Sequence, residues 1–269
     1  PSLQQPYSTR PEYLQFNQRT PSLSTIPPSV ARSMELANLR PQPVGPRYFW
    51  KWESPRRLSH QPVLSDAGSP QFATPRIWFP TDGPELIAVA RTVGRTQVRG
   101  ETQDVVSSPL AGPVALGPTT VLGFVGLADG NLLAIDLLRG NMEGLRQEWR
   151  SRVGGRLNRK PVPTADAVFA AGDHAGVAKV DLGTGDVAWR TEPNADRVAA
   201  VNDEFVYVRE RFGSVLIYDR AGRTADPVTR RLEPLARLEL PGFDLPVTND
   251  RSDRLIVASE SGLLVCLRD

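Results

Sequence analysis

The sequence predicts an all-β protein: a β-propeller of four-stranded antiparallel blades, preceded by an extended N-terminal arm. Two observations favour this fold class. From Tyr48 onward, short apolar runs alternate with turns of Gly, Asp, Asn and Pro, which is the pattern of short strands. A hairpin pattern of apolar strand, glycine-containing turn and second apolar strand also recurs five times, at a spacing of about one blade. The turn glycines are Gly83, Gly130, Gly176, Gly213 and Gly262.

The N-terminal arm, residues 1–46, is rich in Pro, Gln, Ser and Arg. Because proline lacks an amide donor and fixes φ, this stretch cannot form a sheet ladder of its own. We expect an extended arm with room for one short helix, Val30–Leu39, capped by Ser29. The propeller is then expected to span residues 47–269.

Each predicted blade is built around one of the five hairpins, with an inner strand before it and, in most blades, an outer strand after it. The hairpins are Arg76–Val89, Val121–Asp136, Ala167–Asp181, Phe205–Asp219 and Leu255–Cys266. The inner strands are Gln61–Leu64, Gly112–Ala115, Lys160–Val162, Arg197–Ala200 and Leu245–Val247. The outer strands are Gln147–Arg150, Val187–Arg190 and Leu235–Leu238.

One repeat carries a more specific pattern. In Val180–Arg190 a strand ends in Asp181, a Thr-Gly turn follows at Gly185, and Trp189 lies on the outer strand. This segment closely resembles the repeat of the quinoprotein-like (PQQ-like repeat) β-propeller family, and the match is partial around Trp149. The resemblance implies that Trp149 and Trp189 dock against the next blade, where a large ring is buried between sheets. A generic antiparallel sandwich is the alternative fold.

The ring must also close. The last repeat stops at Asp269 without an outer strand, whereas Tyr48–Glu53 alternates like an outer strand with no hairpin before it. We therefore expect Tyr48–Glu53 to pair antiparallel with Leu263–Cys266, giving five blades closed by strand sharing. The alternative is that further blades precede Pro1.

The residues that catalysis needs are few. Net charge is only +2, which argues against nucleic-acid binding, and no apolar run is long enough to span a bilayer. Enzymatic quinoproteins generally place adjacent cysteines beside the quinone and hold calcium with Glu, Asn and Asp, but this chain has Cys266 alone. We expect no cofactor, no metal and no enzymatic activity. Cys266 is interpreted as a buried, inert thiol, His174 as a solvated turn residue, and His60 as structural.

Acidic residues recur at the predicted turns. They are Asp82, Asp129, Asp173, Asp203 and Asp253. Since equivalent propeller loops share one face, these carboxylates could bind a cation or a basic partner. Asp is also a good turn former in its own right, because its side chain accepts hydrogen bonds from local backbone donors, and this second interpretation is favoured.

The resemblance implies a function class. Non-enzymatic members of the family include outer-membrane assembly lipoproteins of the BamB type, which use the propeller as a docking platform. We therefore expect a protein-interaction scaffold in a bacterial cell-envelope assembly, in the periplasm, with a signal or anchor upstream of Pro1 removed. A ligand- or glycan-binding propeller and a quinoprotein oxidoreductase remnant are the alternatives. The arm carries the candidate partner-binding residues Tyr7, Tyr13, Leu14, Phe16, Leu23 and Ile26.

Overall fold

The computed structural model describes residues 50–65, 75–117, 119–211, 213–245, 247–249, 252 and 254–267. The chain divides into two units, which are described separately. The first contains the described residues 50–55 and the turn Arg91–Arg95, and the second contains Arg56–Ala90 and Thr96–Asp269. The predicted helix Val30–Leu39 and the six candidate partner-binding residues of the arm lie outside the described residues.

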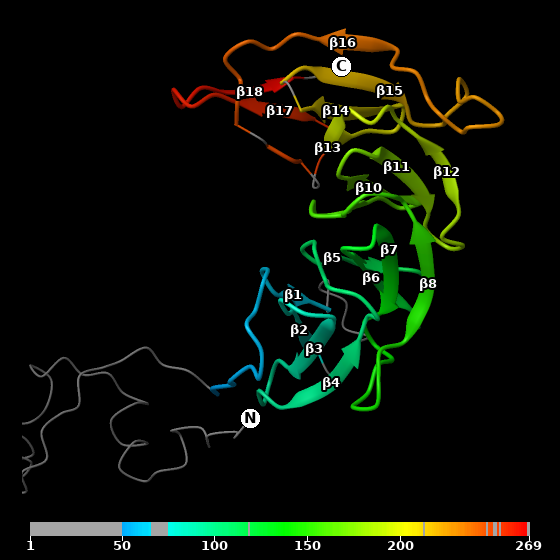
Figure 1. Ribbon diagram of the computed structural model, residues 1–269. Helices are drawn as coiled ribbons and strands as arrows, with labels where there is room; N and C mark the ends of the chain where they lie inside the picture. The colour runs from blue at the N-terminus through cyan, green and yellow to red at the C-terminus, as the bar shows by residue number, and fades with distance from the viewer. Residues whose placement is uncertain are drawn as a thin grey trace, which may run out of the picture. The chain divides into compact units, whose positions relative to one another are not determined.

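The second unit is built from strands alone: no helix occurs among its described residues, and none anywhere in the described chain could cross a membrane. Four antiparallel sheets have four strands each, in the orders β1-β2-β3-β4, β5-β6-β7-β8, β9-β10-β11-β12 and β13-β14-β15-β16 (Figure 1). The strands are β1 (Val63–Leu64), β2 (Arg76–Pro80), β3 (Glu85–Ala90), β4 (Thr96–Glu101), β5 (Ala111–Ala115), β6 (Val121–Gly126), β7 (Asn131–Asp136), β8 (Gln147–Arg152), β9 (Val162–Pro163), β10 (Ala167–Gly172), β11 (Gly176–Asp181), β12 (Val187–Arg190), β13 (Ala195–Val201), β14 (Phe205–Glu210), β15 (Val215–Asp219), β16 (Ala236–Leu238), β17 (Leu255–Ala258) and β18 (Leu264–Leu267). The all-β propeller fold is thereby confirmed.

The tight turns inside the sheets follow from the recurring glycine. In the third sheet Gly172 of β10 pairs with Gly176 of β11, and Gly176 has a φ of +79°. Gly130 lies at the same place between β6 and β7, with a φ of +86°. Side chains other than glycine rarely adopt this left-handed conformation, so the glycine marks where these two hairpins reverse.

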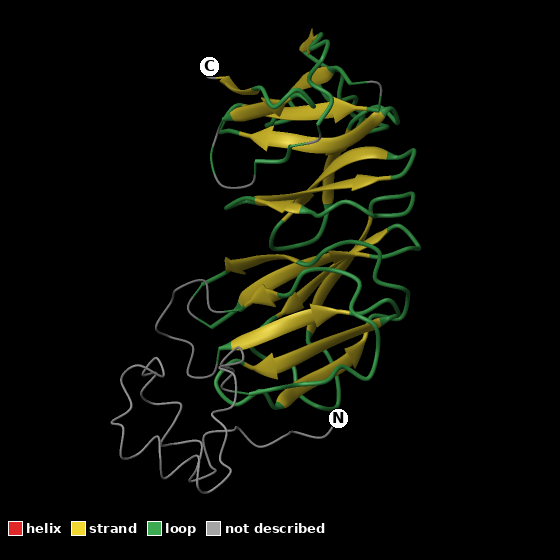
Figure 2. Ribbon diagram, turned by 90° about the vertical axis from the view of Figure 1, so that its left-hand side faces the viewer, coloured by secondary structure: helices red, strands yellow, loops and turns green. Residues whose placement is uncertain are grey.

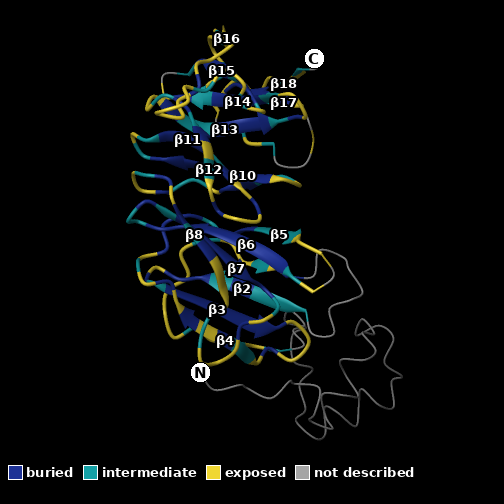
Figure 3. Cartoon of the chain, turned by 90° about the vertical axis from the view of Figure 1, so that its right-hand side faces the viewer, coloured by how far each residue is buried: buried dark blue, intermediate teal, exposed yellow. Residues whose placement is uncertain are grey.

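The sheets pack face to face in chain order through separate apolar cores (Figures 2 and 3). Phe124 of the second sheet packs with Val168 and Val180 of the third, and Phe169 of the third packs with Val208 of the fourth. A sheet with a neighbour on each side must be apolar on both faces. All residues of β6 and β10, in the second and third sheets, are accordingly buried, which explains why these strands read as continuous apolar runs.

The last sheet has two strands among the described residues, β17 and β18, and Leu245 bridges to Ala258 beside them. The burial of β18 alternates, with Leu264 66% exposed. Cys266 points the same way and is exposed, so the expectation of a buried thiol was wrong. An apolar strand buries both faces only when sheets cover both sides, and among the described residues β18 is covered on one. The predicted pairing of Leu263–Cys266 with Tyr48–Glu53 stays a prediction, as does the count of five blades.

Candidate interaction site

Docking tryptophans join neighbouring sheets. Trp149 at the end of the second sheet is 8% exposed, packs against Phe124 at a ring-centroid distance of 5.7 Å, and lies on the β11–β12 turn of the third sheet. Its Nε1 donates to the carbonyl of Leu182 over 2.9 Å. A β-carbon added to Gly185 would lie 2.8 Å from the indole, so the turn needs glycine both for its φ of +78° and for this close approach.

Trp189 repeats the arrangement one sheet further on. It is 1% exposed, packs against Phe169, and donates from Nε1 to the carbonyl of Arg220 over 3.2 Å. Its indole lies against Gly222 in the β15–β16 turn. The two tryptophans predicted to dock therefore occupy equivalent positions, each with one backbone acceptor and one glycine in the following sheet.

The first unit contains a third copy of this contact, which sequence reasoning missed. Nε1 of Trp50 donates to the carbonyl of Arg91 over 2.7 Å, and a β-carbon on Gly94 would lie 2.5 Å from the indole. Arg91–Arg95 is the turn between β3 and β4, the counterpart of the turns under Trp149 and Trp189. The signal that could have found it is the matching order, a Trp-containing segment followed by a hairpin and then a glycine turn.

The two turns that receive Trp149 and Trp189 are each organised by an aspartate at the end of the preceding strand. A carboxylate oxygen of Asp181 accepts hydrogen bonds from the backbone amides of Gly183 and Thr184, at 2.9 and 2.8 Å. Asp219 accepts from the amides of Ala221 and Arg223 and from the Arg223 guanidinium. Side-chain hydrogen bonds from Arg223 hold the pKa of Asp219 at about 2, against the opposing effect of burial. These carboxylates are therefore local turn caps.

The predicted turn carboxylates do not converge. Asp129 pairs with Arg150 and Asn131, Asp173 accepts from Asn158, and Asp203 is fully exposed. Asp253 lies outside the described residues. Within the described chain, no group of three His, Cys, Asp or Glu side chains could hold a metal ion. His174 is exposed in the β10–β11 turn, and the Arg211 guanidinium lies 3.3 Å from its Nδ1.

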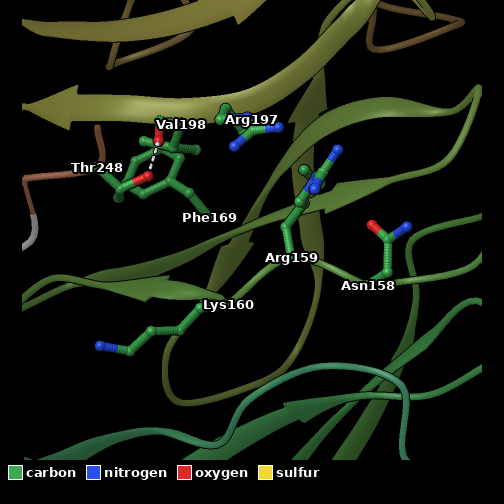
Figure 4. Close-up of a pocket in the computed structure, with 8 residues that line it drawn as sticks. Asn158, Arg159, Lys160, Phe169, Arg197, Val198 and Thr248 are labelled. Carbon is green, nitrogen blue, oxygen red and sulfur yellow. Dashed lines mark hydrogen bonds between the residues drawn. The ribbon is translucent and has the colours of Figure 1, made fainter. Parts of the chain in front are cut away.

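A pocket of about 340 Å³ lies between the third and fourth sheets, and sequence reasoning missed it as well. Four separate segments build its wall: the loop before β9, strand β10, strand β13, and residues 247–249 (Figure 4). The last segment is held by a hydrogen bond from Thr248 Oγ1 to the carbonyl of Val198, over 3.1 Å. The residues that line it are Asn158, Arg159, Lys160, Phe169, Ala171, Arg197, Val198 and Thr248.

The pocket is positively charged on an apolar base. Nη2 of Arg159 lies 3.0 Å from Asp196 Oδ1, and Nη2 of Arg197 lies 2.8 Å from Asp196 Oδ2, so one carboxylate serves two guanidiniums. Burial would raise the pKa of Asp196, but hydrogen bonds from both arginines outweigh it and hold that pKa below its usual value. In Figure 4 Arg159 lies on the side of Asn158 and Arg197, while Lys160 extends away from them.

The stacked four-stranded sheets and their docking tryptophans define a β-propeller of quinoprotein-like (PQQ-like) repeats. A family model described as outer membrane protein assembly factor BamB matches residues 50–225, more than half of the chain. The chain therefore belongs to the BamB family of outer membrane protein assembly factors.

Individual relatives match in part. BamB of Burkholderia pseudomallei (strain K96243) is 39% identical over 62 residues, which are 22% of this chain and only 16% of that protein. The crystal structure of BamB from Moraxella catarrhalis has a TM-score of 0.44 at 15% identity, covering 68% of this chain and 58% of that one. BBS1N in complex with ARL6DN has a TM-score of 0.52 at 13% identity, covering 84% of this chain and 68% of that one, and this likeness shows the fold alone.

Proposed function

We propose that the chain is a non-catalytic interaction scaffold, an accessory subunit that assists the assembly of outer membrane proteins in a bacterial cell envelope, acting in the periplasm. The observation that supports this proposal is the family match over residues 50–225, which spans the repeated sheets from β1 to β15. Because the matched relative is aligned over a sixth of its own length, its role is carried over here as a proposal.

The packing of the blades suits a rigid platform. Trp78, Trp149 and Trp189 are at most 8% exposed, so the large aromatic rings join sheets to one another. What the blades offer to solvent is their turns and outer edges, and rigid scaffolds commonly bind partners through such connecting segments. The same burial weakens the glycan-binding alternative for these three rings, since a buried indole cannot stack on a sugar.

The arm, residues 1–46, is proposed as an attachment segment separate from the propeller. Pro-rich segments lose little conformational freedom when they bind, and apolar anchors spaced by polar residues suit a groove on another subunit. The proposed anchors are Tyr7, Tyr13, Leu14, Phe16, Leu23 and Ile26.

Affinity purification tests the proposal. The affinity-tagged chain is purified from its own envelope under mild detergent, and the bound proteins are identified by mass spectrometry. We expect subunits that assemble outer membrane proteins, at a fixed ratio to the chain. Recovery of the chain as a monomer, together with substrate turnover by the purified protein, would contradict the scaffold proposal.

A further inference from the structure

We propose that the pocket between β10 and β13 binds an acidic side chain, and most favourably a glutamate, presented by a peptide segment of a partner protein. The inference rests on the proposed function only for the source of the ligand. The charge, the polar groups and the shape of the pocket each support it.

The charge of the pocket favours an anion. Arg159, Lys160 and Arg197 all line it, and Asp196 pairs with both arginines. Asp196 is 13% exposed and holds both guanidiniums in place, so their remaining donors are oriented before a ligand arrives. Oriented guanidinium donors bind carboxylates through charge-assisted hydrogen bonds.

Two polar atoms of the pocket wall lack partners. Within the described chain, Nε of Arg159 and Oδ1 of Asn158 are buried and make no hydrogen bond. Buried polar groups are normally paired, so the wall is incomplete by itself. One is a donor and the other an acceptor. Because both atoms are buried, a ligand reaches them only if the two side chains move. The groups that a carboxylate meets first are the guanidiniums of Arg159 and Arg197, whose side chains are 38% and 21% exposed.

The shape of the pocket agrees with a side chain that has an apolar stem. Phe169, Ala171 and Val198 contribute the apolar part of the lining. A volume of about 340 Å³ is at the small end of ligand pockets, which range over roughly 300–1,000 Å³. The methylene groups of a glutamate can lie on this apolar base while its carboxylate reaches the guanidiniums.

The test is a titration of the full chain with two matched peptides, one containing a central glutamate and the other glutamine at that position. Binding is followed by NMR through the Nε–Hε signals of the arginines, assigned with Arg159→Lys. We expect the glutamate peptide to shift the Arg159 and Arg197 signals and to bind at least about tenfold more tightly than the glutamine peptide, the change expected when one charge-assisted hydrogen bond is lost.

Variants locate the site. Arg197→Gln is expected to weaken binding of the glutamate peptide about tenfold. Because this change also alters the pairing of Asp196, Lys160→Gln serves as a second variant at an exposed position, with a severalfold loss expected. Arg146→Gln removes an exposed charge just before β8, away from the pocket, and is the matched control, expected to bind like the unaltered chain.

Equal affinity for the two peptides, or unchanged affinity in both pocket variants, would overturn the inference. Inorganic phosphate is titrated separately: if phosphate binds and the glutamate peptide does not, the pocket is a phosphate site and the peptide proposal is wrong. These results are independent of the affinity purification. Failure of the peptide to bind, with assembly subunits still recovered, removes this inference and leaves the proposed function standing.

Discussion

Trp149 and Gly185 are in contact across two neighbouring sheets, with the indole lying where a β-carbon on the glycine would have to be. The indole N–H donates to Leu182 in the same turn, so one side chain satisfies a donor, buries a ring and fixes the distance between the sheets. The contact recurs between Trp189 and Gly222 and between Trp50 and Gly94. Its repetition makes it the unit from which the blade packing is built.

Gly185→Ala tests this contact. The new methyl would meet Trp149 at 2.8 Å, and alanine at a φ of +78° is strained in addition. We expect a loss of about 2–4 kcal/mol in the free energy of unfolding, measured by urea titration. Gly183→Ala, two residues earlier in the same turn, has Asp181 at 3.6 Å as its nearest neighbour and is expected to be close to neutral. Equal effects would show that the Trp149 contact does not matter.

Truncation of the docking ring is the complementary change. Trp189→Ala removes a side chain that is 1% exposed and should cost about 3–5 kcal/mol of stability. Leu264→Ala, at a position that is 66% exposed, is the control and should change stability by less than about 0.5 kcal/mol. A near-neutral Trp189→Ala in chemical denaturation would refute the assignment of Trp189 as a docking residue.

Much of the blade architecture could be predicted from the sequence because it is encoded locally. The turn glycines and the apolar runs around them mark strand ends and reversals within a few residues. The predicted outer strand Val187–Arg190 coincides with β12, and the predicted inner strand Gly112–Ala115 lies within β5. The position of Trp189 relative to Gly185 also follows a repeat that is visible in the sequence.

What escaped prediction depends on contacts between distant segments. The pocket joins Asn158, Arg197 and Thr248, which no local pattern relates to one another. Cys266 lies on an apolar strand that resembles a buried one, and its exposure follows from which side of β18 is covered. The docking of Trp50 was missed because its segment was assigned a pairing role from its alternation and from the missing outer strand of the last repeat.

Acid sensitivity is expected from Asp219. Its folded-state pKa of about 2 lies below the ordinary value of 3.8. The stabilisation that ionised Asp219 gives the folded state is therefore fully present above about pH 4 and is lost as the pH falls toward 2. Arg223 is 77% exposed, so solvent screens its interaction with Asp219. We therefore expect ionised Asp219 to contribute about 1–2 kcal/mol to the free energy of unfolding. Asp219→Asn should therefore flatten the dependence of unfolding free energy on pH between 4 and 2. Asp203→Asn changes an exposed carboxylate and should keep the steep fall of unfolding free energy between pH 4 and 2. The same steep fall in Asp219→Asn would contradict the prediction.

Deletion of residues 1–40 separates attachment from folding. If the arm is an attachment segment, the shortened chain unfolds in one cooperative transition, measured by circular dichroism, but is no longer recovered with its assembly. Normal association of the shortened chain would show that the arm is not needed for attachment. Failure to fold would show instead that the arm belongs to the core of the propeller.

The most direct test of the scaffold proposal is the amount of correctly assembled outer membrane β-barrel protein in cells that lack the chain, measured by protease protection of the folded barrels. The proposal predicts a lowered amount that is restored by the unaltered chain and by Cys266→Ser, because no reaction depends on the thiol. An unchanged amount of assembled barrels in the deficient cells would contradict the assignment to outer membrane protein assembly.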